Sequence, residues 1–296
     1  MLRKTLISGV TLVICLLVYR GIDRRIENRY KVVYPRHQNS TQLLNRIDRE
    51  RKAPPPKNRK FAVMVCGLVD DCGHHQMLAT YRSLLKNGFP KNNIYILEGD
   101  GKSIYGIEDF YPIDDSATID SISTLFAYLE RRVTNRDLLL VYISDHGELK
   151  IRPVAPKTSS VQGLVGGEWE STIVLWDKEM GEKYFANRLN RIHPRVGIYM
   201  FTQCYSGGFA ERLAGPGRIT IATSQKEKQS YSDGSSMCFS TAFFEAFHNP
   251  SSDADKDGKI SVREAFKWAR VKDKDKAFNT PFIRYGLDRD TSLKEP

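Results

Sequence analysis

Two short segments of the chain carry the residue types of a thiol nucleophile and its base. The letters SDHG at 144–147 end one strand-like segment, and TQCYSGG at 202–208 ends another. A nearby imidazole generates or stabilises the thiolate of a cysteine, and the thiolate is a strong nucleophile. Cys204 is therefore the candidate nucleophile, and His146 is the candidate acid and base.

The glycines beside these two residues suit the same chemistry. Gly147 allows its backbone N–H to face a reacting carbonyl, and the two glycines at 207–208 let the turn after Cys204 pass close to a substrate. The N–H groups of Gly147 and Cys204 are candidates for an oxyanion hole, in which one donor contributes about 3–4 kcal/mol in a known case. The alternative is a buried structural cysteine and a hydrogen-bonded histidine.

The surrounding sequence alternates strand-like and helix-like segments, which predicts a mostly parallel sheet covered on both faces. Ligands bind outside the carboxyl ends of such strands. If the strands ending at 147 and 208 are neighbours with matched ends, His146 and Cys204 come within reach although 58 positions separate them. The predicted strands are 61–67, 93–100, 137–147, 171–177 (a strand or an edge hairpin), 195–208 (a strand that runs into a helix) and 218–224, and the predicted helices are 75–85, 116–133, 182–192 and 236–247.

The two motifs, with HHQ at 74–76 and SYSD at 230–233, make the stretch 60–270 resemble the caspase/legumain clan of cysteine peptidases. Among its branches, the chain is most similar to the legumain-type peptidase C13 family. The resemblance implies a caspase–hemoglobinase-like three-layer sandwich. It also implies an endopeptidase that cleaves protein or peptide substrates through a thioester acyl-enzyme, with Cys204, His146 and Gly147 in the site and no cofactor for catalysis. Two alternatives stay open, a transpeptidase of the same clan and a catalytically inactive binding module.

The resemblance also places a first specificity pocket. Ser230, Tyr231 and Asp233 stand where the family lines that pocket. Asp233 would favour a basic substrate residue if it faces the pocket, whereas a solvated loop aspartate would not affect specificity. The chain departs from legumains around the histidine of the first loop, where CGHHQ (72–76) replaces their Asn and Arg. Thr202 also replaces the acidic residue two positions before their nucleophile.

A twelve-residue segment, 253–264, fits the EF-hand calcium loop. The pattern requires oxygen ligands at alternate positions, a glycine at position 6 for a sharp turn, and a glutamate at position 12. Gly258 stands at position 6, and the segment predicts a Ca²⁺ site; the alternative is an acidic turn that opens a helix. The predicted ligands are Asp253, Asp255, Asp257, Lys259 through its carbonyl, Ser261 and Glu264.

The charge is concentrated in the N-terminal part. The chain has 296 residues, with 45 Lys and Arg against 35 Asp and Glu, a net charge of +10. Residues 1–60 hold 15 basic and 4 acidic residues (+11), so the remaining 30 and 31 leave the rest at −1. A near-neutral body argues against a nucleic-acid enzyme.

The N-terminal part divides into an apolar and a basic stretch. The apolar run 5–19 lies between basic residues, so residues 1–22 are predicted to form a hydrophobic helix that anchors the chain in a membrane. A cleaved signal peptide and a buried helix are the alternatives, and the side of the membrane is not settled. Residues 23–59 are predicted to be a basic, Pro-containing tether, and residues 60–290 the peptidase-like domain.

Overall fold

The computed structural model describes residues 41–53, 59–67, 71–102, 111–153, 167–232, 238–287 and 291–294. All of them belong to one compact unit, residues 38–296. The predicted hydrophobic helix at 1–22 lies outside these residues. Among the helices in the described ranges, none has the length and apolar character needed to cross a membrane.

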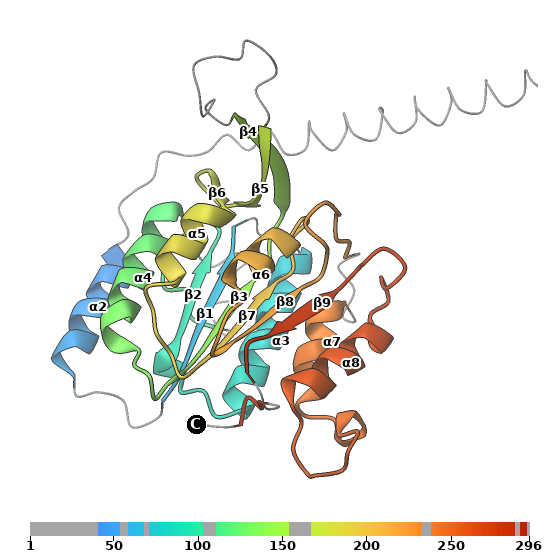
Figure 1. Ribbon diagram of the computed structural model, residues 1–296. Coiled ribbons are helices and arrows are strands. Elements are labelled where there is room, and N and C mark those ends of the chain that lie inside the picture. Colours follow the sequence, from blue (N-terminus) through green and yellow to red (C-terminus); the bar gives the residue numbers. More distant parts are fainter. Residues whose placement is uncertain are drawn as a thin grey trace, which may run out of the picture. The chain divides into compact units, whose positions relative to one another are not determined.

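A six-stranded sheet forms the centre of the unit (Figure 1). Its strand order is β2-β1-β3-β7-β8-β9, and every neighbouring pair is parallel except β8 with β9. Continuous apolar runs form the inner strands because both of their faces are buried. The strands are β1 (Lys60–Cys66), β2 (Ile94–Glu98), β3 (Leu138–Ile143), β7 (Val196–Phe201), β8 (Arg218–Ala222) and β9 (Phe282–Tyr285).

Helices cover both faces of this sheet. Alternate residues of β1 enter two separate apolar clusters, with Val63 in one and Met64 in the other. One cluster includes side chains from α2 (Thr41–Lys52), α4 (Ile119–Arg132), α5 (Glu182–Leu189) and α6 (Gly207–Leu213). The other includes side chains from α3 (Asp71–Lys86), α7 (Phe239–Ala246) and α8 (Val262–Lys272). The prediction of a three-layer α/β sandwich with a mostly parallel sheet is confirmed.

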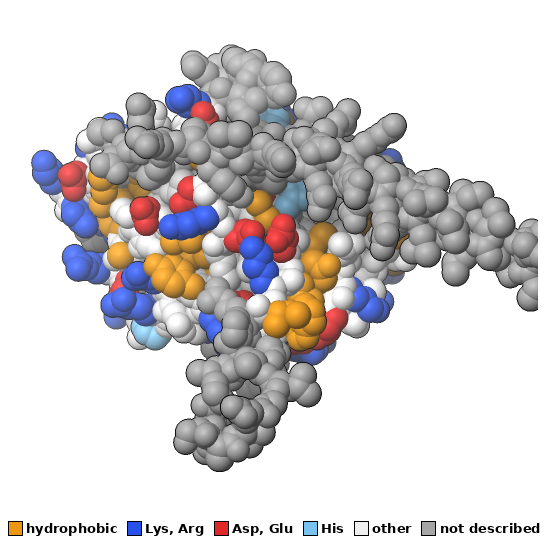
Figure 2. Space-filling view, turned by 90° about the horizontal axis from the view of Figure 1, so that it is seen from above, with side chains coloured by type: hydrophobic (Ala, Val, Ile, Leu, Met, Phe, Trp, Pro, Cys, Tyr) orange, Lys and Arg blue, Asp and Glu red, His pale blue; other side chains and the backbone are white. Residues whose placement is uncertain are grey.

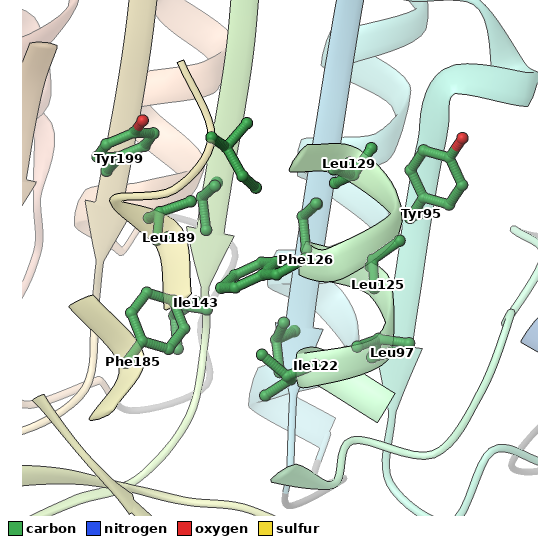
Figure 3. Packing of buried hydrophobic residues seen from close by; sticks show 14 of the residues in the cluster. Tyr95, Leu97, Ile122, Leu125, Phe126, Leu129, Ile143, Phe185, Leu189 and Tyr199 are labelled. Carbon is green, nitrogen blue, oxygen red and sulfur yellow. The ribbon is translucent and has the colours of Figure 1, made fainter. Parts of the chain in front are cut away.

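Helix α4 shows how the sequence builds one outer layer. The Thr118 side chain caps its first turn by accepting a hydrogen bond from the Ser121 N–H at 3.2 Å. Leu125 and Leu129 recur at helical spacing and face the sheet (Figure 3). Phe126 meets Phe185 of α5 edge-to-face, with ring centroids 5.4 Å apart. The packing joins two helices above the strands that end at the candidate site.

A second, three-stranded antiparallel sheet stands beyond the end of β3 (Figure 1). It contains β4 (Gly147–Pro153), β5 (Gly167–Val174) and β6 (Glu179–Gly181). The prediction of one strand over 137–147 is wrong at its carboxyl end, because β3 stops at Ile143 and Gly147 begins β4. Of the two alternatives predicted for 171–177, a strand or an edge hairpin, the structure agrees with the hairpin, because β5 ends at Val174 and pairs antiparallel with β6 in this small sheet. The short 3₁₀ helices η1 (Lys91–Asn93) and η2 (Pro250–Ser252) complete the described elements.

Helix α2 corrects the predicted tether, 23–59. Leu43 and Ile47 of this helix are buried in the core. Glu50 accepts hydrogen bonds from the hydroxyls of Tyr95 and Tyr128 at 2.6 and 2.7 Å. Burial and the bond to Glu50 raise the pKa of Tyr128 to about 12. Residues 41–52 are therefore part of the folded body and not a solvated spacer.

Arg46 joins α2 to the sheet, so replacing it tests whether α2 belongs to the folded body. Its guanidinium pairs with the buried Asp114 and donates to the Ile94 carbonyl at 3.1 Å. We expect Arg46→Ala to lower the free energy of unfolding by about 3 kcal/mol, because it leaves the Asp114 carboxylate buried without its partner. Urea denaturation measures the change. Arg51→Ala, which removes an exposed pair with Asp48, should cost less than about 0.5 kcal/mol. Equal losses of unfolding free energy in the two variants would contradict the packing of α2 on the sheet.

Candidate active site

The central sheet brings the two predicted catalytic segments together. Strands β3 and β7 are parallel neighbours, and Ile143 lies opposite Phe201 at their carboxyl ends. His146 lies three residues after Ile143, and Cys204 lies three residues after Phe201. Both line one pocket of about 120 Å³. The prediction of adjacent strands with matched ends is confirmed.

The turn at Cys204 has a strained backbone and is fixed by the segment that follows β8. Tyr205 has a φ of 60°, a conformation that costs energy for a residue with a side chain and is concentrated at functional sites. The Tyr205 N–H donates to the Lys228 carbonyl at 2.9 Å. The Cys204 thiol donates to the Ser230 carbonyl at 3.3 Å. These contacts present a half-buried sulfur at the pocket wall.

Gly147 lies against the backbone of the nucleophile turn. A Cβ at this position would overlap the carbonyl oxygen of Cys204, so only glycine permits the close approach. The Val174 N–H donates to the His146 carbonyl at 3.0 Å, which makes Gly147 and Ile173 a pair without hydrogen bonds to each other. The Gly147 N–H therefore points away from β5.

Asp145 fixes the backbone that carries His146. Its carboxylate accepts hydrogen bonds from the Gly67 N–H at 2.5 Å and from the His146 N–H at 2.7 Å. A Cβ at Gly67 would overlap this carboxylate. The end of β1 and the segment after β3 are thus joined through one side chain, while His146 itself is exposed.

The pocket contains a hydroxyl network around Gln76 of α3. The Gln76 side-chain carbonyl accepts hydrogen bonds from Tyr142, Ser144 and Ser240, at 3.2, 3.0 and 2.9 Å. Burial raises the pKa of Tyr142, so its hydroxyl stays protonated and can donate. Gln76 belongs to the CGHHQ segment, and nothing in the sequence around it indicates that it lies at the pocket.

Two of the three predicted specificity residues lie at the pocket. Ser230 and Tyr231 line it, whereas Asp233 lies outside the described residues. Asn279 also lines the pocket and was missed. Its side-chain amide accepts from the Tyr231 N–H at 2.8 Å and donates to the Tyr231 carbonyl at 3.0 Å. No local sequence signal marks this contact, because the two residues are 48 positions apart.

The acidic loop 253–264 is separate from this pocket, and the side-chain oxygens of Asp253, Asp255 and Asp257 lie within 4.8 Å of one another. The Gly258 N–H donates to Asp253 Oδ2 at 3.0 Å, and Gly258 has a φ of 81°. Lys259, whose carbonyl is one of the predicted ligands, follows directly after this turn.

The Glu264 carboxylate is bonded within the same loop. One oxygen accepts from the Ser261 N–H at 2.9 Å, and the other accepts from the Ala254 N–H at 2.7 Å. Ser261 caps α8 and forms a reciprocal capping box with Glu264. Partial burial alone would raise the pKa of Glu264, but the hydrogen bonds from Ser261 and Ala254 outweigh it and lower the pKa.

Acidic and basic side chains are interspersed on the face shown in Figure 2, among the described residues. This distribution agrees with the near-zero net charge of the chain after residue 60.

Comparison with known proteins identifies no family. No protein-family model matches the sequence, and no curated protein matches it significantly. Among solved structures, the chain is similar to protein GSU0716 from Geobacter sulfurreducens. The identity is 14%, the match covers 78% of this chain and 95% of that chain, and the TM-score is 0.48. A score this low carries no argument about function, which must be argued from the residues of this chain.

Proposed function

We propose that the protein is a cysteine endopeptidase with Cys204 as nucleophile and His146 as acid and base. The observation that carries the proposal is the convergence of two strand-end segments, from β3 and β7, on one pocket. The strained turn at Tyr205 and the close packing of Gly147 support it. The caspase–hemoglobinase-like assignment is part of the same proposal and rests on the motif order and the three-layer architecture.

The proposed reaction passes through a thioester. His146 takes the proton of the Cys204 thiol, and the sulfur attacks the carbonyl carbon of the peptide bond. The N–H groups of Gly147 and Cys204 stabilise the oxyanion of the tetrahedral intermediate. His146 then gives the proton to the leaving amine, and the thioester remains on Cys204. Water, deprotonated by His146, hydrolyses the thioester and restores the thiol.

Incubation with a diverse peptide library, followed by mass spectrometry of the products, tests this function. We expect two fragments from each cleaved peptide, with a free carboxylate on the amino-side fragment. Fragments joined to an added amine would instead identify the transpeptidase alternative, in which an amine replaces water. Peptide binding without any new product would identify the inactive binding module.

We also propose that the loop 253–264 binds Ca²⁺. The three aspartates present oxygens at the spacing of a single cation, and Asp253 Oδ1 is buried without a hydrogen-bond partner in the described part of the chain. Carboxylate oxygens of this kind are the ligands that Ca²⁺ prefers. Glu264 would have to exchange its bonds to the Ser261 and Ala254 N–H groups for the cation. Bound Ca²⁺ would stabilise the start of α8 and would take no part in the thiol chemistry.

Removing the aspartates tests the calcium proposal. We expect millimolar Ca²⁺ to raise the melting temperature of the wild type, because a ligand that binds only the folded state stabilises it. Asp253→Asn combined with Asp255→Asn should abolish that rise while Asp48→Asn, an exposed substitution on α2, leaves it intact. Calorimetry at several Ca²⁺ concentrations measures the shift. An unchanged wild-type melting temperature would refute the proposal.

The membrane anchor at 1–22 is a proposal that rests on the sequence alone, since those residues lie outside the described part of the chain.

A further inference from the structure

Two exposed aromatic side chains lie in contact beside the candidate catalytic pocket. Tyr231 is 53% exposed and Phe278 is 67% exposed, and their ring centroids are 5.4 Å apart. Tyr231 also lines the pocket that contains Cys204 and His146. Single exposed apolar residues are ordinary on a protein surface, but paired aromatic rings beside a polar pocket leave more apolar surface in water than the fold requires.

Hydrogen bonds at Tyr231 itself and at the residues that follow Phe278 fix the backbone that carries the two rings. The Asn279 side chain bonds both the N–H and the carbonyl of Tyr231, and it also donates to the buried Asp273 at 2.9 Å. Next along the chain, the Thr280 N–H donates to the Thr223 carbonyl at 3.1 Å. Thr223 itself lines the pocket. The segment that carries Phe278 is therefore fixed relative to the end of β8 and to the nucleophile turn.

We propose that Tyr231 and Phe278 form an apolar subsite for a large aliphatic or aromatic side chain of the substrate. This inference rests on the proposed endopeptidase function, because it places the second or third substrate residue on the amino side of the cleaved bond against the two rings. An extended peptide whose carbonyl lies at Cys204 passes the pocket wall formed by Tyr231. Covering both rings removes apolar surface from water on the enzyme and on the substrate, which favours binding.

Matched peptides test the subsite. In the library peptide that binds Cys204→Ala protein most tightly, each residue is replaced in turn by Phe, Leu or Gly. We expect wild-type kcat/KM to be about tenfold higher for Phe or Leu than for Gly at one of these positions. Phe278→Ala should reduce this ratio to near one, and Phe278→Leu should retain most of it. Tyr184→Ala, which removes an exposed aromatic ring on α5 away from the pocket, should preserve the wild-type ratio.

A binding measurement separates failure of the subsite from failure of the proposed function. Fluorescence polarisation with Cys204→Ala protein gives dissociation constants for the same peptides without turnover. Tighter binding of the Phe peptide than of the Gly peptide, lost when Phe278→Ala is added, supports the subsite even if no peptide is cleaved. Equal dissociation constants for the two peptides, no binding of either, or a ratio unchanged by Phe278→Ala would overturn it. Melting temperatures of the variants confirm that each is folded.

Discussion

Replacing Cys204 by alanine should abolish peptide cleavage and lower kcat/KM by at least about 10⁴-fold, to the background of the assay. The thiol supplies the bond that forms with the substrate carbon. The free thiols of Cys66 and Cys238 are buried. Initial rates with the best library peptide, measured on purified Cys204→Ala and wild-type protein, give the ratio.

A second cysteine variant controls for general damage to the fold. Cys66 ends β1 with its side chain in the core, so Cys66→Ala should lose some stability and keep turnover within a few-fold of the wild type. The melting temperature of Cys204→Ala should stay near that of the wild type, because its side chain is only half-buried. Undiminished cleavage by a folded Cys204→Ala protein would remove Cys204 from the mechanism.

Replacing His146 by alanine should lower kcat/KM by about 10²–10⁴-fold, the usual contribution of a positioned acid or base. Without the imidazole, the thiol must lose its proton to solvent, and the leaving amine must take one from solvent. The loss should appear in single-turnover rates as well as at steady state, because two of the three proton transfers assigned to His146 belong to the formation of the thioester.

Added imidazole distinguishes a chemical role of His146 from a structural one. We expect free imidazole to restore part of the His146→Ala rate, since the residue is exposed and its removal leaves room at the pocket. His193→Ala, an exposed histidine after α5, should retain the wild-type rate and show no response to imidazole. A His146→Ala rate equal to that of the wild type would exclude the assigned acid and base.

The central sheet and its two reactive ends could be predicted because the signals are local. The apolar runs of β1, β3 and β7 are nearly continuous, and a parallel sheet aligns the carboxyl ends of its strands on one edge. His146 and Cys204 could therefore be placed together from their positions after two such runs. The cause of the glycine at 147 is not local, because a Cβ there would overlap the carbonyl oxygen of Cys204, which is 57 positions further along the chain.

The parts that were missed depend on contacts distant in sequence. Helix α2 is polar along most of its length, and only its packing on the tyrosines of β2 and α4 identifies it as part of the body. The break between Ile143 and Gly147 follows from pairing of β4 with β5, whose first residue is 20 positions further on. A run of strand-forming residues does not show where one sheet ends and another begins.

Contacts between residues distant in sequence also explain what could not be predicted at the site. Gln76 bonds Ser240 across 164 positions, and Asn279 bonds Tyr231 across 48. These pairs are made by tertiary packing, so neither motif nor periodicity marks them. In the acidic loop, the pattern predicted the three clustered aspartates but not the bonds that hold Glu264 to the Ala254 and Ser261 N–H groups.

The most direct test of the central claim is to identify the thiol that a substrate-like electrophile modifies. Wild-type protein is treated with a peptide carrying a carbon electrophile in place of the cleaved bond, then digested and sequenced by tandem mass spectrometry. We predict a single adduct on Cys204, formed more slowly in His146→Ala, with Cys66 and Cys238 unmodified in the folded protein. An adduct on another cysteine, or equal labelling of Cys204→Ala, would contradict this claim.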